Sequence, residues 1–271
     1  MYINRDNPGR VNAFGAASLS GLLAGKAAVV TGGARGLGLA VANAFAEAGA
    51  EGLAVDLPAA AASAGLPSGF DFYPADVTSE AAIAAAIGAA VQRFGRLDIV
   101  VANAGLVPPW RATEALDLDE WDQVFAVNVR GVAATLKHAA PAMKDSGASI
   151  IVMCSINSWR AHPRQMLYTA TKHAALGIAR AAALDLGRHG IRVNGIAPGP
   201  IATDALLTRI RARAASGGPA EAEALGAMAA ETALGRMATA EEVARTALFL
   251  ASDLSSGITG RVFPVDAGLL P

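Results

Sequence analysis

Cysteine is nearly absent from this chain of 271 residues, because Cys154 is its only one. A single cysteine cannot form an intrachain disulfide, so a disulfide-built scaffold is excluded. An excess of one charge sign is missing too, since 22 lysines and arginines against 23 aspartates and glutamates leave a net charge of −1. Such a chain has no overall basic field that recruits nucleic acid or an anionic membrane. We therefore expect no nucleic acid and no membrane among its partners.

Long apolar runs are also lacking, although 53% of the residues are hydrophobic. Charged residues or glycines break every run before the ~18 residues that a membrane span needs. The first ten residues have neither the charged nor the apolar region of a secretory signal, so we expect a cytoplasmic protein. No histidine shows metal-ligand spacing, and we predict no metal site; the four are His138, His162, His173 and His189.

Short apolar runs alternate with helical patterns along the chain. The runs lie at 26–31, 51–56, 70–75, 97–102, 148–154, 191–197 and 259–265. They are continuous rather than alternating, which is typical of parallel strands buried on both faces. We predict long helices at about 119–144 and 168–188. The order predicts one α/β domain over 23–271, with a doubly wound parallel sheet flanked by helices on both faces.

Two segments fall outside this alternation. Residues 1–22 form a polar lead-in, which we expect either to be disordered or to lie across a partner subunit. Residues 204–232 have a polar helical pattern with Ser-Gly-Gly-Pro at 216–219. Because small and turn-forming residues interrupt it, we predict a mobile excursion from the domain.

Glycines directly follow the first predicted strand. The run at 32–38, Gly-Gly-Ala-Arg-Gly-Leu-Gly, stands between that strand and an alanine-rich helix. Glycines in this turn let the backbone approach a pyrophosphate, which the positive helix N-terminus stabilises. The spacing is G-x-x-x-G-x-G rather than G-x-G-x-x-G, and tight turns also require glycine. The position between a strand and a helix nevertheless favours a dinucleotide site.

Two residues bear on which dinucleotide is preferred. Asp56 ends the second predicted strand, twenty residues after Gly36, where a carboxylate accepts hydrogen bonds from the adenosine ribose and repels a 2′-phosphate. Arg35 lies in the glycine turn, where a basic side chain is able to reach a 2′-phosphate. No basic residue follows Asp56, because Leu57 and Pro58 come next. We predict NAD as the cofactor, with NADP as the alternative.

Tyr168 and Lys172 lie four residues apart in the predicted helix 168–188. This spacing puts both side chains on one helix face. The ammonium favours the phenolate form, so the tyrosine becomes able to act as a general acid or base. Ser155, thirteen positions earlier, is placed to hold a carbonyl or alcohol oxygen beside it. Taken alone, the same spacing is also typical of a solvated helix face.

Three features fall at the ends of predicted strands, namely Asn103, Ser155 and the pair 198–199, Pro-Gly. In an open α/β sheet, ligands bind at the carboxyl edge of the strands. We therefore predict that these features belong to one site. Asn128 lies within the predicted helix 119–144, where a polar side chain is costly unless it makes hydrogen bonds.

Together these motifs resemble those of the short-chain dehydrogenase/reductase (SDR) family, over roughly residues 22–268. In the family's order the chain carries 31–38, Asp76-Val77, Asn103-Ala-Gly105, Asn128, Ser155, Tyr168-x-x-x-Lys172 and Pro198-Gly199. Each motif is weak by itself, whereas the combination is highly specific. The resemblance implies a Rossmann-like fold. One departure is Ala102, where the family usually has asparagine; that loop acts mainly through its backbone, so we expect little consequence.

The resemblance implies catalytic roles for four residues. Tyr168 would be the acid/base, Lys172 would bind the nicotinamide ribose and assist the tyrosine, and Ser155 would polarise the substrate oxygen. Asn128 would kink its helix and hold a water that links Lys172 to solvent. The implied reaction interconverts a secondary alcohol (a polyol, sugar, hydroxy acid or cyclic alcohol) and its ketone, with NAD(H) as the hydride carrier.

The remaining implied contacts hold the cofactor. The pyrophosphate would lie along Gly32, Arg35, Gly36, Leu37 and Gly38. Asp56 would bind the adenosine ribose. Asp76 and Val77 would bind the adenine. Asn103 and Gly105 would flank the adenosine half of the cofactor. The carboxamide would lie beside Pro198, Gly199, Ile201 and Thr203.

The substrate is less constrained. The resemblance places its pocket between three segments, with candidates Val107, Trp110, Ser155, Asn157, Trp159, His162, Met166 and Pro200. This mixture fits a small polar carbonyl or polyol about as well as an aromatic or alicyclic ketone. Arg160 and Arg164 either bind an anionic substrate or are exposed loop arginines, and the second interpretation is favoured.

Other functions stay open. One is an NADP-dependent carbonyl or 3-oxoacyl reductase of the same family. The others are an SDR-like lyase and a nucleotide-binding regulatory subunit, against which the intact glycines of the turn and Lys172 argue. Because SDR members are usually tetramers, we expect a homotetramer or a homodimer, with the helices 119–144 and 168–188 as subunit faces.

Overall fold

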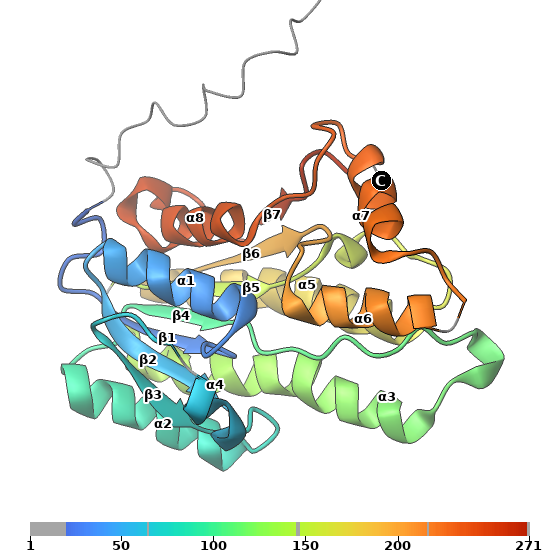
Figure 1. Ribbon diagram of the computed structural model, residues 1–271. Coiled ribbons are helices and arrows are strands. Elements are labelled where there is room, and N and C mark those ends of the chain that lie inside the picture. Colours follow the sequence, from blue (N-terminus) through green and yellow to red (C-terminus); the bar gives the residue numbers. More distant parts are fainter. Residues whose placement is uncertain (1–19, 64, 145–146, 216, 270–271) are drawn as a thin grey trace, which may run out of the picture.

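The computed structural model describes residues 20–63, 65–144, 147–215 and 217–269, so residues 1–19 of the lead-in lie outside the described part. Its sheet has the strand order β3-β2-β1-β4-β5-β6-β7, and every pair is parallel. The strands are β1 (Ala27–Thr31), β2 (Glu51–Asp56), β3 (Phe70–Pro74), β4 (Ile99–Ala102), β5 (Ser149–Met153), β6 (Arg192–Pro198) and β7 (Val262–Val265). The predicted doubly wound α/β fold is confirmed (Figure 1).

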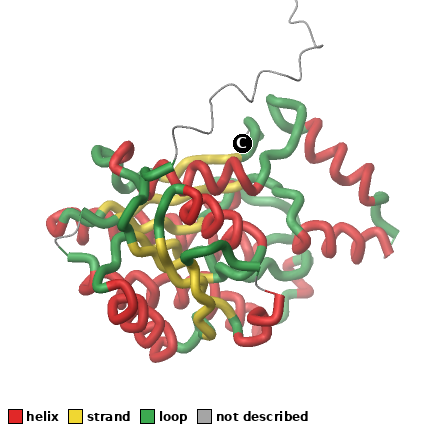
Figure 2. The backbone as a smooth tube through the Cα atoms, turned by 60° about the vertical axis from the view of Figure 1, so that its left-hand side comes forward, coloured by secondary structure: helices red, strands yellow, loops and turns green. Residues whose placement is uncertain are grey.

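The sheet is covered on both faces, which explains why its strands are apolar throughout. Alternate residues of one strand enter different cores: Val29 packs with Val100 on one face, and Val30 packs with Val101 on the other. The first face is covered by α2 (Glu80–Phe94), α4 (Val132–Ala142) and α5 (Met166–Leu186). The second is covered by α1 (Gly36–Glu47) and α8 (Ala240–Ala251). Figure 2 shows the twisted strands between the two helical layers.

Local signals set the ends of α2. The Ser79 side chain accepts a hydrogen bond from the Ala82 N–H, which satisfies one of the free donors of the first turn. Gly95 ends the helix in the left-handed conformation, with φ of 73°. Between these caps Ile83 and Ile87 point into the core, as their four-residue spacing requires.

The long helix predicted over 119–144 is not α-helical throughout. It consists of α3 (Leu118–Phe125), a π-helical segment η4 (Ala126–Gly131) and α4. The π segment contains Asn128, whose side chain bonds to a neighbouring loop instead of facing a purely apolar core. A π turn adds a residue to the helical repeat, so it changes the direction in which a side chain points.

Several predicted boundaries shift by two or three residues. The last strand begins at Val262 rather than 259, because Thr259 and Arg261 bond instead to the backbone of Val193 and the side chain of Asn194. The helix predicted to begin at Tyr168 begins two residues earlier, at Met166.

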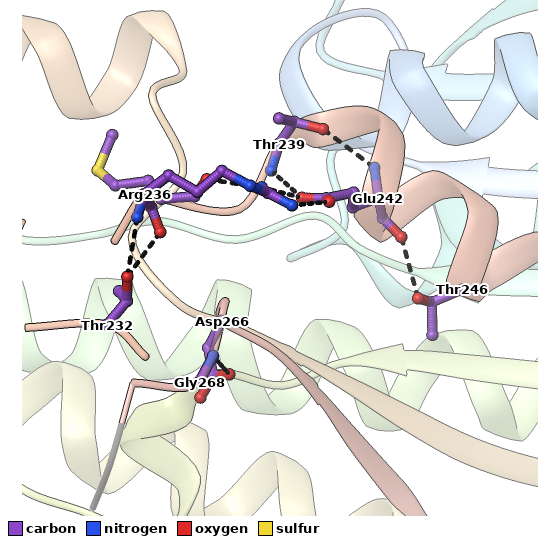
Figure 3. Close-up of polar contacts among 8 residues, drawn as sticks. Thr232, Arg236, Thr239, Glu242, Thr246, Asp266 and Gly268 are labelled. Carbon is purple, nitrogen blue, oxygen red and sulfur yellow. Dashed lines mark hydrogen bonds and ion pairs between the residues drawn. The ribbon is translucent and has the colours of Figure 1, made fainter. Parts of the chain in front are cut away.

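The polar excursion contains two helices, α6 (Asp204–Ala215) and α7 (Glu221–Ala230). The chain then returns to the sheet through a cluster of polar contacts (Figure 3). Arg236 makes a two-pronged ion pair with Glu242, while Glu242 also accepts from the Thr239 N–H and so caps α8. Within the described parts of the chain, no helix is both long and apolar enough to cross a membrane.

Candidate active site

The carboxyl ends of β1, β4, β5 and β6 lie next to one another at one edge of the sheet. β1 and β4 are neighbours in the sheet, although two strands and their connections separate them in the chain. This is the point where the strand order reverses, and it is where open α/β sheets form a ligand crevice. The glycine turn and Asn103 line it, while Ser155 follows the next strand, β5.

Thr31 and Asn103 join the two loops at the crevice. The Thr31 hydroxyl accepts from the N–H groups of Asn103 and Ala104, at 3.0 and 3.1 Å. In return, the Asn103 side-chain amide donates to the carbonyls of Thr31 and Gly32, at 2.9 and 3.1 Å. The Asn103 side chain therefore ties the glycine turn to the loop after β4.

Two glycines of the turn are required for different reasons. Gly32 has a φ of 64°, a left-handed conformation that side chains disfavour. Gly38 has ordinary helical geometry, but a Cβ there would overlap the carbonyl oxygen of Gly32 and would lie 2.7 Å from the Asn103 amide nitrogen. The backbone is therefore bare where α1 begins, and the N–H groups of that first turn have no carbonyl partner in the helix. Such a cradle suits a pyrophosphate.

Asp56 ends β2 beside this cradle. Its carboxylate is largely buried and accepts from the N–H groups of Ala34, at 3.1 Å, and Leu57, at 2.8 Å. No cation pairs with it among the described residues. Arg35, the residue before α1, is exposed. An unpaired carboxylate at the strand end accepts further hydrogen bonds from hydroxyl groups and repels a phosphate, so the residues present fit NAD.

Ser155 follows β5 and is tied to α5 through Ser158. The Ser155 N–H donates to the Ser158 hydroxyl at 3.3 Å, and that hydroxyl donates to the Lys172 carbonyl at 2.8 Å. The Ser155 hydroxyl oxygen accepts from the Asn157 N–H at 3.2 Å. Among the described residues its proton has no acceptor, so it is available to a ligand oxygen.

Lys172 is 6% exposed and its ammonium points along α5 toward Tyr168. It donates to the carbonyl of Met153 at the end of β5, at 2.8 Å, and lies 5.7 Å from the centre of the Tyr168 ring. An ammonium has three protons, so two remain for a ligand. The predicted Tyr168–Lys172 pair is therefore held at the strand edge, and it does not form a solvated helix face.

Asn128 is 1% exposed and clamps the loop that follows β4. Its side-chain oxygen accepts from the Leu106 N–H at 2.7 Å, and its nitrogen donates to the Leu106 carbonyl at 2.8 Å and to the Thr171 hydroxyl at 3.2 Å. A Cβ on Gly105 would be 3.4 Å from the Asn128 oxygen and 3.9 Å from the Lys172 nitrogen. Asn128, Gly105 and Lys172 therefore meet at one point.

The other residues predicted to touch the cofactor lie along the same edge. Asp76 is exposed and accepts from the Thr78 N–H, whereas Val77 is buried against Gly131 of the π segment. Past the end of β6, a Cβ on Gly199 would lie 2.8 Å from Asp266. Pro198 is the last residue of β6, Ile201 bridges to Ala238, and Thr203 caps α6 through Leu206.

Exposed apolar side chains gather on the segments around Tyr168. Five of the exposed large hydrophobic residues lie there, in the loop after β4, in the segment before α5 and at the first residue of α5: Leu106, Val107, Trp110, Trp159 and Met166. Val107, Trp110 and Tyr168 also line one pocket, together with Arg111, Glu120 and Arg164. Apolar side chains that remain exposed beside polar ones are typical of a ligand site.

Two predicted substrate residues have other partners. The Asn157 amide nitrogen donates to the side chains of Gln165 and Thr169, at 2.8 and 3.4 Å, so it fastens the segment before α5. His162 is half-buried, and the charge of Glu231, the residue after α7, acts on it. Burial and the neighbouring Arg160 lower the pKa of His162, while Glu231 acts in the opposite direction. His162 is therefore mostly neutral at neutral pH.

The sequence interpretation missed two residues. Thr31 was included in the glycine motif, but its role in joining two loops depends on sheet order. Arg209 of α6 was not named at all; burial lowers the pKa of its guanidinium, and Tyr168 acts in the opposite direction. The only sequence signal was a basic residue in a segment that shapes the substrate site. The described residues include no cluster of three or more potential metal ligands among His, Cys, Asp and Glu.

Comparisons with known proteins agree with this geometry. Residues 32–270 match the family model described as Enoyl-(Acyl carrier protein) reductase. The chain is 39% identical to Short-chain dehydrogenase reductase 4 of Arabidopsis thaliana, over 93% of this chain and 85% of that protein. It is also 39% identical to momilactone A synthase of Oryza sativa subsp. japonica, over 91% of this chain and 90% of that protein.

Solved structures with the same fold include carveol dehydrogenase from Mycobacterium avium in complex with NAD. The TM-score is 0.86 at 30% identity, covering 92% of this chain and 99% of that chain. Levodione reductase gives a TM-score of 0.83 at 30% identity, covering 90% of this chain and 97% of that chain.

Proposed function

Because this chain belongs to the short-chain dehydrogenase/reductase family, we propose that it uses NAD(H) to interconvert a secondary alcohol and its ketone. The chain is an oxidoreductase that acts on CH–OH groups. The choice of NAD is supported chiefly by Asp56, an unpaired carboxylate at the end of β2. The NAD bound to the similar carveol dehydrogenase supports it as well.

The dinucleotide would lie along the glycine turn, with its pyrophosphate at the start of α1 and its adenosine ribose on Asp56. Lys172 would bind the nicotinamide ribose with the two protons that Met153 leaves free. When bound, the nicotinamide supplies the hydride acceptor or donor. The proton is then transferred by side chains of this chain.

Tyr168 carries the proton step. In the oxidation direction its oxygen takes the hydroxyl proton of the alcohol, the carbon loses its hydride, and the ketone remains. The Ser155 hydroxyl donates a hydrogen bond to the reacting oxygen and so holds that oxygen beside Tyr168. The Lys172 ammonium lies 5.7 Å from the centre of the Tyr168 ring, beside the reacting groups. In the reduction direction the same groups act in reverse.

Asn128 completes the site by holding the loop after β4. We propose that a water beside the Asn128 oxygen, near Gly105, passes protons between Lys172 and solvent. The close approach of both groups to Gly105 supports this route.

Tyr168→Phe tests the assignment, with Tyr73→Phe on β3 as the matched control. We expect Tyr168→Phe to reduce kcat by about 10³-fold, because it removes the general base, while binding of NAD⁺ measured by calorimetry stays near that of the wild type. Tyr73 packs against the core from the edge strand β3 and has no part in the proposed proton transfer, so its variant should keep its turnover. Retained turnover in Tyr168→Phe would contradict the mechanism.

The assay follows NADH formation and consumption with secondary alcohols, polyols, sugars, hydroxy acids and cyclic ketones, with NADP(H) run beside NAD(H). We expect a clear preference for NAD, and Asp56→Ala should narrow it because the repulsion of a 2′-phosphate is lost. Activity with NADP alone would instead favour the reductase alternative and give Arg35 the decisive role.

Assembly is a further part of the proposal. Leu118 on α3 is 70% exposed and Leu184 on α5 is 85% exposed, although both are apolar. Burial of these residues between subunits would support the expected homotetramer or homodimer. Size-exclusion chromatography with light scattering tests this, and a monomer at assay concentration would reject it.

A further inference from the structure

Gln165 lies immediately before α5 and lines the same pocket as Tyr168. Its side chain is half-buried and does not cap the helix that follows. The two residues are three positions apart at the start of the helix, a spacing at which side chains are neighbours. A ligand that meets Tyr168 in this pocket therefore lies beside Gln165 as well.

All but one of the polar groups of Gln165 are already bonded. Its backbone N–H donates to the His162 carbonyl at 3.2 Å, and its backbone carbonyl accepts from the Thr169 N–H at 2.9 Å. Its side-chain oxygen accepts from the Asn157 amide nitrogen at 2.8 Å. Only the side-chain nitrogen is left, and it donates to no residue in the described part of the chain. Two N–H donors are thus available at the wall of the pocket.

Asn157 fixes the direction of these donors. It is 3% exposed, and three hydrogen bonds hold it, because its amide also donates to the Thr169 hydroxyl at 3.4 Å and its backbone N–H donates to the Ser155 hydroxyl at 3.2 Å. The oxygen and the nitrogen of an amide leave its carbon in different directions, so the Gln165 nitrogen points away from Asn157. A polar chain therefore runs from Ser155, which we place on the reacting oxygen, to the donors of Gln165.

The other polar side chains of the pocket are engaged or exposed. Arg111 and Glu120 neutralise each other through two hydrogen bonds, at 2.8 and 3.3 Å. Arg164 is exposed, and its backbone carbonyl accepts from the Arg111 N–H at 3.0 Å. Apolar groups form much of the remaining wall, among them Val107, Trp110 and Leu167. A neutral donor beside apolar groups suits a neutral oxygen, because such an oxygen costs less to withdraw from water than a carboxylate.

We propose that the Gln165 amide donates a hydrogen bond to a second oxygen of the substrate, namely a carbonyl, ether or hydroxyl oxygen that does not itself react. This inference rests on the proposed function, because it concerns the substrate of that same site. The Cβ atoms of residues three apart on a helix are about 5–6 Å from each other, so the second oxygen lies only a few bonds from the reacting carbon. Gln165 is then a specificity-determining residue.

Calorimetry with two ketones of one shape tests the proposal without turnover. Tetrahydropyranone, with its ether oxygen opposite the carbonyl, differs from cyclohexanone only in that oxygen, which replaces a CH₂ group. Each ketone is titrated into the full-length protein saturated with NAD⁺, which has no hydride to give, so neither is reduced. The ratio of the two affinities, ether ketone over cyclohexanone, should fall by about 2- to 10-fold in Gln165→Met, the range of one hydrogen bond between neutral groups.

Two further variants separate ligand binding from support of the fold. Gln165→Glu keeps a side-chain oxygen for Asn157 but has no donor at neutral pH, so it should lower the ratio as well. Gln92→Met removes an exposed amide from α2, which does not line the pocket, and should leave the ratio unchanged. If circular dichroism shows Gln165→Met misfolded, the comparison of Gln165→Glu with the wild type decides the result.

Several results would overturn the proposal. An unchanged ratio in the Gln165 variants would do so, and so would an equal loss of affinity for both ketones, which a purely structural role predicts. A lower ratio in Arg164→Met but not in Gln165→Met would assign the second oxygen to Arg164 instead. A wild type that binds neither ketone would reject the donor site. The expected change in ratio without turnover of any alcohol or ketone would reject the proposed function and leave the donor site standing.

Discussion

Replacement by alanine is expected to have opposite effects on stability at two helical glycines. Gly38 lies in the first turn of α1, beside the glycine turn, and Gly88 lies in the middle of α2. A Cβ on Gly88 meets nothing within 4 Å, whereas a Cβ on Gly38 overlaps the Gly32 carbonyl. Neither residue has a positive φ. Alanine therefore introduces no backbone strain at either position, and the difference between the two variants measures the packing of the added Cβ.

The magnitudes follow from helix propensity and from the overlap. In a helix interior alanine is favoured over glycine by ~1 kcal/mol, so Gly88→Ala should stabilise the protein by about 0.5–1 kcal/mol. At Gly38 the overlap of the new Cβ with the Gly32 carbonyl outweighs this gain in helix propensity. The Gly32 carbonyl must move by roughly 1 Å or more to reach ordinary contact distance. That carbonyl accepts from Asn103, so overpacking should give a net loss of about 1–3 kcal/mol.

Thermal unfolding and NAD⁺ titration measure both variants at one protein concentration. At ~2–4 °C per kcal/mol, we expect Tm to rise by about 1–4 °C for Gly88→Ala and to fall by about 2–12 °C for Gly38→Ala. NAD⁺ affinity should fall only for Gly38→Ala, since its Cβ displaces the turn that faces the pyrophosphate. A Gly38→Ala variant with wild-type Tm and NAD⁺ affinity would refute the assignment of this turn.

Three other predictions concern separate parts of the molecule. Asn103→Ala removes two hydrogen bonds to the glycine turn, so NAD⁺ affinity should fall by about 10-fold; unchanged affinity in the calorimeter would show that the turn keeps its shape without them. Burial raises the pKa of the Cys154 thiol, so iodoacetamide should label it only after denaturation, and mass spectrometry of the native protein would reveal a contrary result. Arg236 lowers the pKa of Glu242, so this pair stabilises the fold above the ordinary value of 4.5, and the contribution is lost as pH falls through the lower folded value. Arg236→Gln should therefore lower Tm at neutral pH and weaken its fall in acid, and parallel Tm curves for the two proteins would contradict this pairing.

Much of the fold was predictable because its signals are local. The strands are buried on both faces, so their residues are apolar without alternation, and this pattern is visible in the chain. Ser79 and Gly95 mark the ends of α2 for equally local reasons. Boundaries that depend on distant partners were not predictable. The start of β7 at Val262 results from side-chain contacts with β6, and the π segment around Asn128 is accompanied by contacts with the loop after β4.

The site residues also differ in whether local signals or distant partners determine their positions. Tyr168 and Lys172 were identified from the sequence because a spacing of four residues fixes their common face whatever surrounds the helix. Ser155, Asn103 and the glycine turn were predictable as a group, since the carboxyl ends of parallel strands share an edge. The sequence alone thus determined the family and the fold class, and it singled out the residues to which we assign the proposed reaction.

Tertiary structure decided how these residues are held. Strand order makes β1 and β4 neighbours, which lets Thr31 and Asn103 bond across seventy residues or more of chain. The carbonyl of Met153, at the end of β5, fixes the Lys172 ammonium of α5. Contacts of this kind depend on which elements meet in space. No spacing within one segment encodes them, so they emerged only from the folded chain.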